Sequence, residues 1–456
     1  MGKKYDFKYI VIGSGPAGSA AALTLVKSKK RVALIENRYF GGTNLNTRDV
    51  PYKVALDFSH TYHKLSLYPE FKNQDLTFNF PTIAARELNT IVKTGGNDKK
   101  VFENAGVVCL DGYANLLDQH TIAIGQQKIT AEYFVLATGS RLKTGGISGI
   151  DRIDYLTPNT AVKIRRLPKV ITIIGGGSTG CEIAEYYAEL GVKVLLLEMS
   201  DLLLPREDRE VGETIADYFT RRLGISVLTG CKVVSLEEDN FSKYIVFQTN
   251  GVEKMIRTDY IVLATGSEPI LDYGLENANV KFKNSGITVD KLFQTSAKNI
   301  YAIGDCLGNE SSTERAEKEG LTVAMNLVNK TKITVDYKGM PRIVNLYPEI
   351  ATTGFNESDL LRRDRNYKKS IVKLDEITAS KIYGIEHGFV KLLSDKNSHI
   401  IGATIVAPNA SLMISELSIA VRHNLTALEL ASTPHVCNSF NEAIKLAAKK
   451  LLPKKR

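Results

Sequence analysis

The sequence contains few cysteines, and none of them belongs to a paired motif. The chain has 456 residues but only five cysteines, which are Cys109, Cys181, Cys231, Cys306 and Cys437. Their number is odd and no two form a CxxC pair, which argues against a secreted disulfide framework and a cysteine-based metal or redox pair. We therefore expect a chain that works in a reducing cytoplasm.

Long apolar runs are missing as well. No stretch reaches the roughly 18 apolar residues that a membrane-crossing helix needs. The first residues, MGKKYDFKYIVIG, lead from a short basic segment directly into a predicted strand, so we expect no cleavable signal peptide. Gly2 would suit N-myristoylation, but Asp6 stands where that motif requires serine or threonine.

The charge balance is moderately positive. Lysine and arginine number 59 against 50 acidic residues, a net charge of +9, which favours anionic nucleotides, membranes or partners. The simpler interpretation is a generally basic surface, and we predict no nucleic-acid partner. The one dense basic cluster is the C-terminal AAKKLLPKKR, which is either a solvated terminus or a contact with a membrane surface.

Two segments repeat one supersecondary design. Residues 8–37 and 170–199 each predict a strand, a glycine turn, a helix and a second strand. In each copy three glycines stand at the same offsets, and an acid ends the second strand. They are Gly13, Gly15, Gly18 and Glu36 in the first copy, and Gly175, Gly177, Gly180 and Glu198 in the second.

That spacing fits a dinucleotide. The first glycine permits a tight turn, the second lets backbone approach a pyrophosphate, and the third lets helix and strand pack closely. The helix N-terminus then faces the phosphates, and the acid accepts hydrogen bonds from ribose hydroxyls. Two copies, each with its acid in register, predict two dinucleotide sites.

Three further apolar strands end alike, at glycine. They are YFVLATGS (133–140), YIVLATGS (260–267) and NIYAIGDC (299–306). Strands of this kind end at the mouth of a parallel sheet, where ligands bind. A pure core role explains their apolar character but not the shared endings.

The pattern changes near residue 340. Strand-like runs then come at short intervals without long helices between them, and two helices are predicted near 410–422 and 438–451. We predict an α/β protein with two Rossmann-like dinucleotide-binding domains and a C-terminal α+β domain. The expected division is 1–150 with 276–335, then 151–275, then 336–456.

Residues 41–53, GGTNLNTRDVPYK, resemble the redox segment GGTCxNxGCxPSK of the flavin-dependent pyridine nucleotide-disulfide oxidoreductases, such as lipoamide dehydrogenase and mercuric reductase. The matching residues are Gly41, Gly42, Thr43, Asn46, Pro51 and Lys53. Asn44 and Asp49 stand where the two cysteines belong, and neither side chain can take part in thiol–disulfide exchange. The resemblance therefore implies an atypical member of that family that lacks the redox-active pair.

The resemblance covers nearly the whole chain and implies FAD and NAD as cofactors and a homodimer formed through 336–456. Ala316 would lie under the flavin ring. The residues implied in FAD binding are Gly13, Gly15, Pro16, Ala17, Gly18, Glu36, Asn37, Gly42, Thr43, Lys53, Ala137, Thr138, Gly139, Gly304, Asp305 and Ala316. Those implied in NAD binding are Gly175, Gly177, Ser178, Thr179, Gly180, Glu182, Glu198, Thr265 and Gly266.

Glu198 favours NADH over NADPH, because a carboxylate binds both ribose hydroxyls but repels a 2′-phosphate. The first arginine after it comes only at Arg206. Ser178 stands where relatives often carry a bulky residue that gates the nicotinamide pocket. We expect that gate to be absent or supplied elsewhere.

The resemblance places Lys53 and Glu182 as a pair beside flavin N5, where an ammonium would stabilise negative charge on the reduced ring. Asp49 would lie against the opposite flavin face. If ionised it would disfavour electron density on the ring, and if burial raises its pKa it would donate a proton to a reduced acceptor. Arg48 is a candidate to neutralise it instead.

The family signature HxHPTxxE, supplied by the partner subunit, corresponds here to HVCNSFNE at 435–442. Aligned without a gap on Glu442, Cys437 replaces the catalytic second histidine, and a shifted alignment would place His435 there. Cys437 is then either a thiol activated by His435 or a buried small apolar residue. His60 and His63 are predicted to be ordinary surface or interface residues, and no metal site is expected.

We predict a homodimeric FAD enzyme that oxidises NADH and passes electrons directly to a small-molecule acceptor such as a quinone, without a redox disulfide. The candidate catalytic residues are Lys53, Glu182, Asp49, Glu442 and Cys437. Two alternatives stay open: a pyridine nucleotide transhydrogenase, which Glu198 disfavours, and a catalytically retired FAD- and NAD-binding protein.

Overall fold

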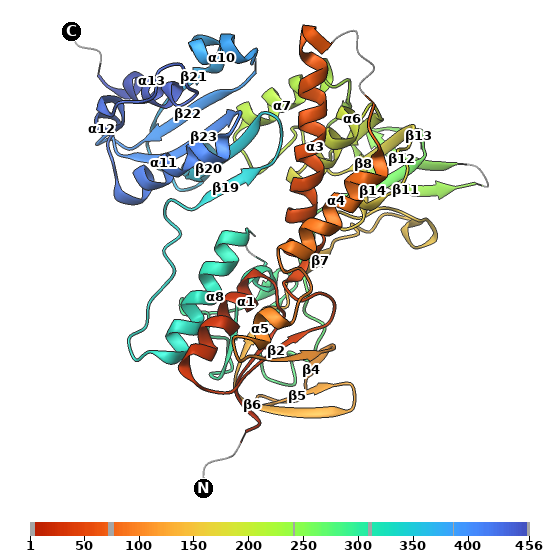
Figure 1. The fold of residues 1–456 in the computed structure, drawn as a ribbon, viewed down its shortest axis with the longest axis vertical. Coiled ribbons are helices and arrows are strands. Elements are labelled where there is room, and N and C mark those ends of the chain that lie inside the picture. Colours follow the sequence, from red (N-terminus) through yellow and green to blue (C-terminus); the bar gives the residue numbers. More distant parts are fainter. Residues whose placement is uncertain (1–4, 72–76, 240–241, 309–311, 386, 454–456) are drawn as a thin grey trace. The chain divides into compact units, whose positions relative to one another are not determined.

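The computed structural model forms an α/β chain of two compact units (Figure 1). It describes residues 5–71, 77–239, 242–308, 312–385 and 387–453. The first unit consists of residues 1–54, 79–143 and 266–336, and the second of residues 55–78, 144–265 and 337–456. Gly2 and the last three residues of the basic C-terminal cluster lie outside the described residues.

A seven-stranded sheet forms the centre of the first unit, in the order β3-β2-β1-β6-β5-β4, with β18 pairing β6. Strands β1 and β2 at its centre are almost fully buried, as expected for apolar strands covered on both faces. The parallel strands are β1 (Phe7–Ile12), β2 (Val32–Glu36), β3 (Val108–Asp111), β6 (Gln127–Leu136) and β18 (Ile300–Ala302). The antiparallel strands are β4 (Ala114–Leu116) and β5 (Thr121–Ile124).

Helices α1 (Pro16–Leu25) and α8 (Thr313–Val328) pack side by side in this unit (Figure 1). A Cβ at Gly320 would lie 2.1 Å from the carbonyl oxygen of Ala17, so only glycine permits this approach. The smaller elements are α2 (Gly42–Asn46), α4 (Phe80–Lys93), α5 (Lys100–Glu103), β7 (Ser140–Leu142), β15 (Ser267–Pro269), β16 (Phe282–Lys283) and β17 (Gly286–Ile287). Helix α3 (Asp49–Leu67) begins in the first unit and passes into the second at Ala55.

The second unit contains a four-stranded parallel sheet in the order β10-β9-β8-β14, beside a three-stranded antiparallel sheet β11-β12-β13. The parallel strands are β8 (Val170–Ile174), β9 (Lys193–Leu197), β10 (Ser226–Leu228) and β14 (Tyr260–Leu263). The antiparallel strands are β11 (Lys232–Glu238), β12 (Lys243–Thr249) and β13 (Val252–Thr258). The helices are α6 (Ser178–Glu189) and α7 (Arg209–Arg221).

The C-terminal part of this unit is a five-stranded antiparallel sheet in the order β19-β20-β23-β22-β21, packed against α11 and α13 (Figure 1). Its strands are β19 (Pro341–Val344), β20 (Glu349–Gly354), β21 (Lys368–Lys373), β22 (Phe389–Ser394) and β23 (Ile400–Ala407). Its helices are α9 (Glu357–Arg362), α10 (Thr378–Tyr383), α11 (Ala410–His423), α12 (Ala427–Ser432) and α13 (Glu442–Leu451). Short 3-10 turns occur along the chain at Val26–Ser28, Pro69–Phe71, Ile150–Arg152, Ala161–Lys163, Gly304–Leu307 and Leu374–Glu376.

The predicted helix at 410–422 is confirmed as α11, but the helix predicted from 438 begins only at Glu442. Asn438 has a φ of +60°, a left-handed backbone conformation that a right-handed helix cannot contain. In the part of the chain that the structure describes, no helix is both long and apolar enough to cross a bilayer.

A fully buried lysine joins three segments of the second unit. The ammonium of Lys391 on β22 lies 3.0 Å from Asp208 and 2.8 Å from Glu210, and it also pairs with Glu357 at the start of α9. Burial opposes ionisation of Glu357, but hydrogen bonds from Lys391, Tyr367 and Lys369 hold its pKa at about 2. The cluster therefore stabilises the fold only while its carboxylates stay charged.

Replacing Lys391 by methionine is expected to lower the free energy of unfolding by about 3 kcal/mol or more, because the buried carboxylates lose the cation that neutralises them. The matched change Lys450→Met removes a half-exposed pair with Glu376 and is expected to cost less than about 1 kcal/mol. Denaturant unfolding measures both.

The same cluster predicts an acid limit. Because the pKa of Glu357 is depressed in the folded state, its contribution is present above its ordinary pKa and is lost as the pH falls from about 4.5 to about 2. This loss is expected to be smaller in Lys391→Met. Equal acid sensitivity in both proteins would contradict the assignment.

Candidate active site

The first glycine turn connects β1 to α1 and is shaped by close backbone contact. Gly13 has a φ of +98°, and a Cβ there would lie 2.2 Å from the carbonyl oxygen of Ala137. At Gly15, by contrast, a Cβ would meet nothing within 4 Å. A Cβ at Gly42 would lie 2.5 Å from the Cα of Gly15, so the segment that resembles the redox motif packs directly on this turn.

Glu36 ends β2 with its carboxylate fixed beside the turn. One oxygen accepts hydrogen bonds from Ser14, at 3.0 Å from the backbone N–H and 2.7 Å from the hydroxyl. The other accepts from the N–H groups of Asn37 and Arg38, both at 2.9 Å. These four contacts occupy the lone-pair sites of the carboxylate, so a ribose hydroxyl would share or replace one of them. Sequence reasoning missed Ser14, which carries no signal of its own within the motif.

Contacts among β7, the 3-10 turn after β18 and helix α8 form a second part of the predicted FAD site. The hydroxyl of Ser140, the first residue of β7, donates at 2.9 Å to Asp305 in the 3-10 turn that follows β18. The N–H of Gly304 donates to the buried Glu319 of α8 at 2.8 Å. Ala316 is buried near the start of the same helix. An open backbone turn, an acid at a strand end and a carboxylate at the neighbouring strand end together fit a dinucleotide such as FAD.

The segment that resembles the redox motif forms α2 and the start of α3. The carboxylate of Asp49 lies 3.4 Å from the ammonium of Lys53, one helical turn later, and both side chains are partly exposed. The amide of Asn46 donates to the carbonyl oxygens of Phe40 and Gly42 at 2.9 and 2.8 Å. Asn44 is half-buried in α2. The position that resembles the second family cysteine thus holds one half of an ion pair with Lys53.

The second glycine turn repeats the first. Gly175 has a φ of +111°, and a Cβ there would lie 2.4 Å from the carbonyl oxygen of Ala264. Glu198 ends β9 and accepts from the N–H of Gly176 at 2.6 Å and of Ser200 at 2.7 Å. Gly177 again leaves open space.

The other predicted NAD-site residues lie on the adjoining elements. Ser178 and Thr179 begin α6, and Thr265 and Gly266 follow β14. Glu182 is buried on α6, where it accepts from the N–H and side-chain amide of Asn345 at 2.8 and 3.0 Å.

The predicted pairing of Lys53 with Glu182 stays a prediction. Lys53 belongs to the first unit and Glu182 to the second.

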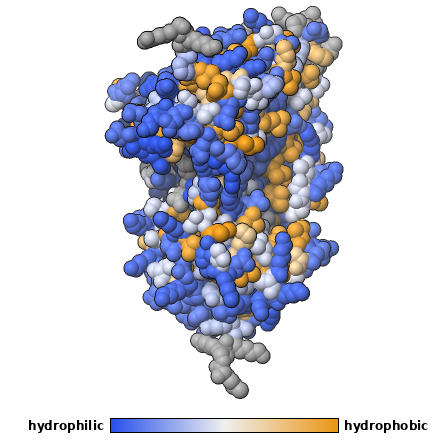
Figure 2. Space-filling model, turned by 90° about the vertical axis from the view of Figure 1, so that its left-hand side faces the viewer, coloured by the Kyte–Doolittle hydropathy of each residue, from blue (hydrophilic) through white to orange (hydrophobic). Residues whose placement is uncertain are grey.

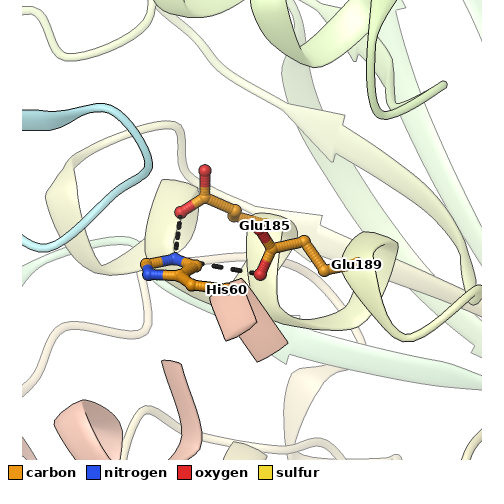
Figure 3. Close-up of side chains that lie close together, drawn as sticks. All are labelled: His60, Glu185 and Glu189. Carbon is orange, nitrogen blue, oxygen red and sulfur yellow. Dashed lines mark hydrogen bonds and ion pairs between the residues drawn. The ribbon is translucent and has the colours of Figure 1, made fainter. Parts of the chain in front are cut away.

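Two further buried acids lie on α6, one and two turns after Glu182. His60 on α3 has its Nε2 3.0 Å from a carboxylate oxygen of Glu185 and 3.8 Å from one of Glu189 (Figure 3). Burial raises the pKa of Glu185 well above its ordinary value, and burial with the charge of Glu185 raises that of Glu189 to about 8. His60 is predicted to be an ordinary surface or interface residue, and the structure places it between two helices, against two buried acids that this prediction does not include.

The sequence did carry a signal for this cluster. Glu182, Glu185 and Glu189 fall on one face of a single helix whose other residues are mostly apolar. His63, one turn after His60, is half-buried, and burial lowers its pKa.

The C-terminal signature segment forms a surface turn before α13. Cys437 is exposed in the single chain, so the prediction of a buried apolar role is wrong there, because the turn at Asn438 leaves it on the surface. Both ring nitrogens of His435 are engaged, at 2.9 Å from the carbonyl oxygen of Thr433 and from Glu416. Glu442 accepts from the N–H of Asn438 at 3.2 Å.

Large apolar side chains are exposed on the C-terminal part, and one face of the chain shows hydrophobic patches among hydrophilic ones (Figure 2). Those on the C-terminal helices and the turn before α13 are Leu361, Ile382, Tyr383, Leu412, Ile419, Leu428 and Val436. Exposed apolar surface of this kind is typical of subunit interfaces.

Comparison with known proteins agrees with this geometry. Residues 7–320 match the family model "Pyridine nucleotide-disulphide oxidoreductase", and residues 340–448 match the dimerisation domain of that family, which supports a homodimer. The chain is 30% identical to a mercuric reductase of Bacillus cereus over 97% of its length and 71% of the relative. It is 31% identical to a dihydrolipoyl dehydrogenase of Chlamydia pneumoniae over 96% of its length and 95% of the relative.

A solved structure shares the fold. The HOCl-induced flavoprotein disulfide reductase RclA from Escherichia coli superposes with a TM-score of 0.86 at 23% identity, over 98% of this chain and all of that one.

The two open glycines predict separable losses. Gly15→Ala is expected to lower FAD retention at least tenfold without changing the melting temperature of the apoprotein, because the added Cβ meets ligand space rather than protein. Gly177→Ala is expected to raise the KM for the nicotinamide cofactor and leave FAD retention unchanged. Flavin absorbance after desalting and steady-state kinetics measure the two effects.

Each variant serves as the control of the other. If Gly177→Ala released FAD, or if Gly15→Ala destabilised the apoprotein, the assignment of the two turns to two cofactors would be contradicted.

Proposed function

The chain belongs to the pyridine nucleotide-disulphide oxidoreductase family, and from this premise we propose that it is an NADH oxidoreductase without a redox disulfide. In this proposal NADH is oxidised at an FAD-containing site, and electrons pass directly to a small-molecule acceptor such as a quinone. The family is FAD- and NAD(P)-dependent, so the proposal concerns the acceptor, the route of the electrons and the choice of NADH.

The single observation that carries the proposal is the Asp49–Lys53 pair, 3.4 Å apart, where the family places a thiol. A carboxylate cannot attack a disulfide. The position that resembles the first family cysteine is occupied by Asn44, whose amide cannot do so either.

The remaining thiols support the same conclusion. All five cysteines lie in the described residues and are free. Burial raises the pKa of Cys109 to about 11, that of Cys306 to about 12 and that of Cys181 well above its ordinary value. Because the thiolate is the reactive form, these three are poor nucleophiles.

The proposed reaction balances with NADH and a quinone alone. NADH provides two electrons and one proton, and reduction of the quinone to a hydroquinone needs two electrons and two protons. Bound FAD supplies the ability to accept two electrons and to release them again. The second proton comes from solvent, and we propose that Asp49 delivers it while Lys53 stabilises negative charge nearby.

The choice of NADH rests on Glu198. Its carboxylate is held by two backbone N–H groups at the end of β9 and is almost fully buried. A 2′-phosphate beside it would meet a fixed negative charge. This also weighs against a transhydrogenase, which must accept NADPH.

The proposal treats residues 1–150 with 276–335 as the FAD-binding domain, 151–275 as the NAD-binding domain and 336–456 as the dimerisation domain. In a homodimer, Cys437 and Glu442 would reach the site from the partner subunit. Their roles there belong to this proposal.

An anaerobic titration with NADH tests turnover directly. We expect one equivalent of NADH to bleach the flavin absorbance, and NADPH to do so at least tenfold less efficiently. With a soluble quinone such as menadione, continuous NADH oxidation is expected to survive thiol alkylation. Unbleached flavin would instead indicate a protein that only binds the cofactors.

The control restores the missing sulfurs. The double variant Asn44→Cys with Asp49→Cys is expected to gain NADH-dependent reduction of a small disulfide, which the natural chain lacks. Brisk lipoamide reduction by the natural chain, abolished by alkylation, would overturn the proposal. NADP⁺ reduction by NADH at a rate above that with quinones would favour the transhydrogenase.

The proton role of Asp49 predicts a pH-dependent defect. Asp49→Asn is expected to lower quinone turnover about tenfold above neutral pH while leaving the rate of flavin reduction by NADH unchanged. Stopped-flow absorbance separates the two half-reactions. Asp57→Asn, an exposed acid on the same helix, is the matched control. Turnover by Asp49→Asn equal to the natural rate across pH would remove this role.

A further inference from the structure

His60, Glu185 and Glu189 bring three potential ligand atoms together within the second unit. Their ring nitrogen and carboxylate oxygens all lie within 4.8 Å of one another, and both acids are buried (Figure 3). His60 extends from α3 and the acids from successive turns of α6 (Figure 3). This cluster is not part of the proposed FAD or NAD contacts.

Glu189 is the unusual member of the cluster. Its side chain is fully buried, and neither carboxylate oxygen has a hydrogen-bond partner. Burial is the largest influence on its pKa and raises it; the ring of His60 and the hydroxyl of Ser59 lower the pKa, but neither makes a hydrogen bond of normal geometry to it. Among the described residues its ion-pair partner is His60 alone, at 3.8 Å. A buried carboxylate in this situation is costly unless a cation or a proton joins it.

His60 cannot satisfy both acids. One ring nitrogen, Nε2, faces both carboxylates, and it is at hydrogen-bond distance only from Glu185. Glu185 is further held by the backbone N–H of Tyr347, at 3.0 and 3.1 Å from its two oxygens. That contact orients the carboxylate in the way that an outer partner orients a metal ligand.

We propose that His60, Glu185 and Glu189 bind a divalent transition-metal cation of the Zn²⁺ type. One imidazole nitrogen and two carboxylates form a donor set that suits Zn²⁺, Mn²⁺ or Fe²⁺. Bonds of about 2.0–2.1 Å place tetrahedral ligand atoms about 3.3 Å apart. The observed 3.0 and 3.8 Å from Nε2 bracket that separation, and the two carboxylate oxygens lie within 4.8 Å of each other, so rotations of the acid side chains would close the site around an ion.

The ion would neutralise the buried acids and fasten α3 to α6. The side chain of His60 is 20% exposed, which leaves an approach from solvent for the ion and for a water as fourth ligand. The inference is independent of the acceptor proposed above, because none of its three ligands is assigned to that reaction.

The test uses FAD-loaded protein stripped with a chelator and then titrated with Zn²⁺ alone. We expect one Zn²⁺ per chain by elemental analysis after desalting, and a rise in melting temperature. X-ray absorption at the zinc edge is expected to show nitrogen and oxygen ligands without sulfur. His60→Gln and Glu189→Gln are each expected to weaken binding at least tenfold.

Matched controls separate this site from chance binding. His63→Gln on the same helix, Glu213→Gln on the exposed face of α7 and Cys437→Ser are expected to bind Zn²⁺ as the natural chain does. The flavin spectrum confirms that each variant is folded.

The inference is overturned if the natural chain retains no Zn²⁺, if His60→Gln and Glu189→Gln bind it equally well, or if sulfur is among the ligands. A cluster that merely shares protons would give the first of these results.

Discussion

The structure depends on a contact made twice: a glycine backbone pressed against the carbonyl oxygen at the end of a neighbouring strand. At Gly13 and Gly175 an added Cβ would lie within 2.4 Å of such an oxygen. This closeness turns the chain sharply into the following helix. The glycine two positions later, Gly15 or Gly177, then faces open space. In both copies the acid at the end of the second strand, Glu36 or Glu198, then binds the N–H groups of the same turn.

Around that repeated scaffold, the family resemblance and the chemistry of this chain diverge. The backbone that would support a redox disulfide is retained, with Gly42 packed on the first glycine turn. At the positions that resemble the family's two cysteines this chain carries Asn44 and Asp49, the latter paired with Lys53, and burial raises the pKa of three of its thiols. This combination supports the proposed transfer of electrons from the flavin to the acceptor without a disulfide intermediate.

Much of this could be predicted from the sequence, because periodicity and glycine spacing determine local geometry directly. The two strand–turn–helix copies and α11 lie where the pattern indicates. The start of α13 and the exposure of Cys437 depend on one left-handed residue, Asn438, which no hydrophobic pattern reveals. The environment of His60 depends on acids more than a hundred positions away in the chain, so its own neighbours in sequence could not indicate it.

The discontinuous first unit has a consequence for how the protein is made. Its sheet includes β18, which pairs with β6, and its glycine-turn helix α1 packs against α8. When the first glycine turn has been synthesised, the core of this unit is therefore incomplete. Its strand β18 and helix α8 are available only after synthesis has passed Val328. Until then the intervening second parallel sheet can form before the first is closed. The parallel sheet that begins later in the chain can therefore be complete before the one that begins first.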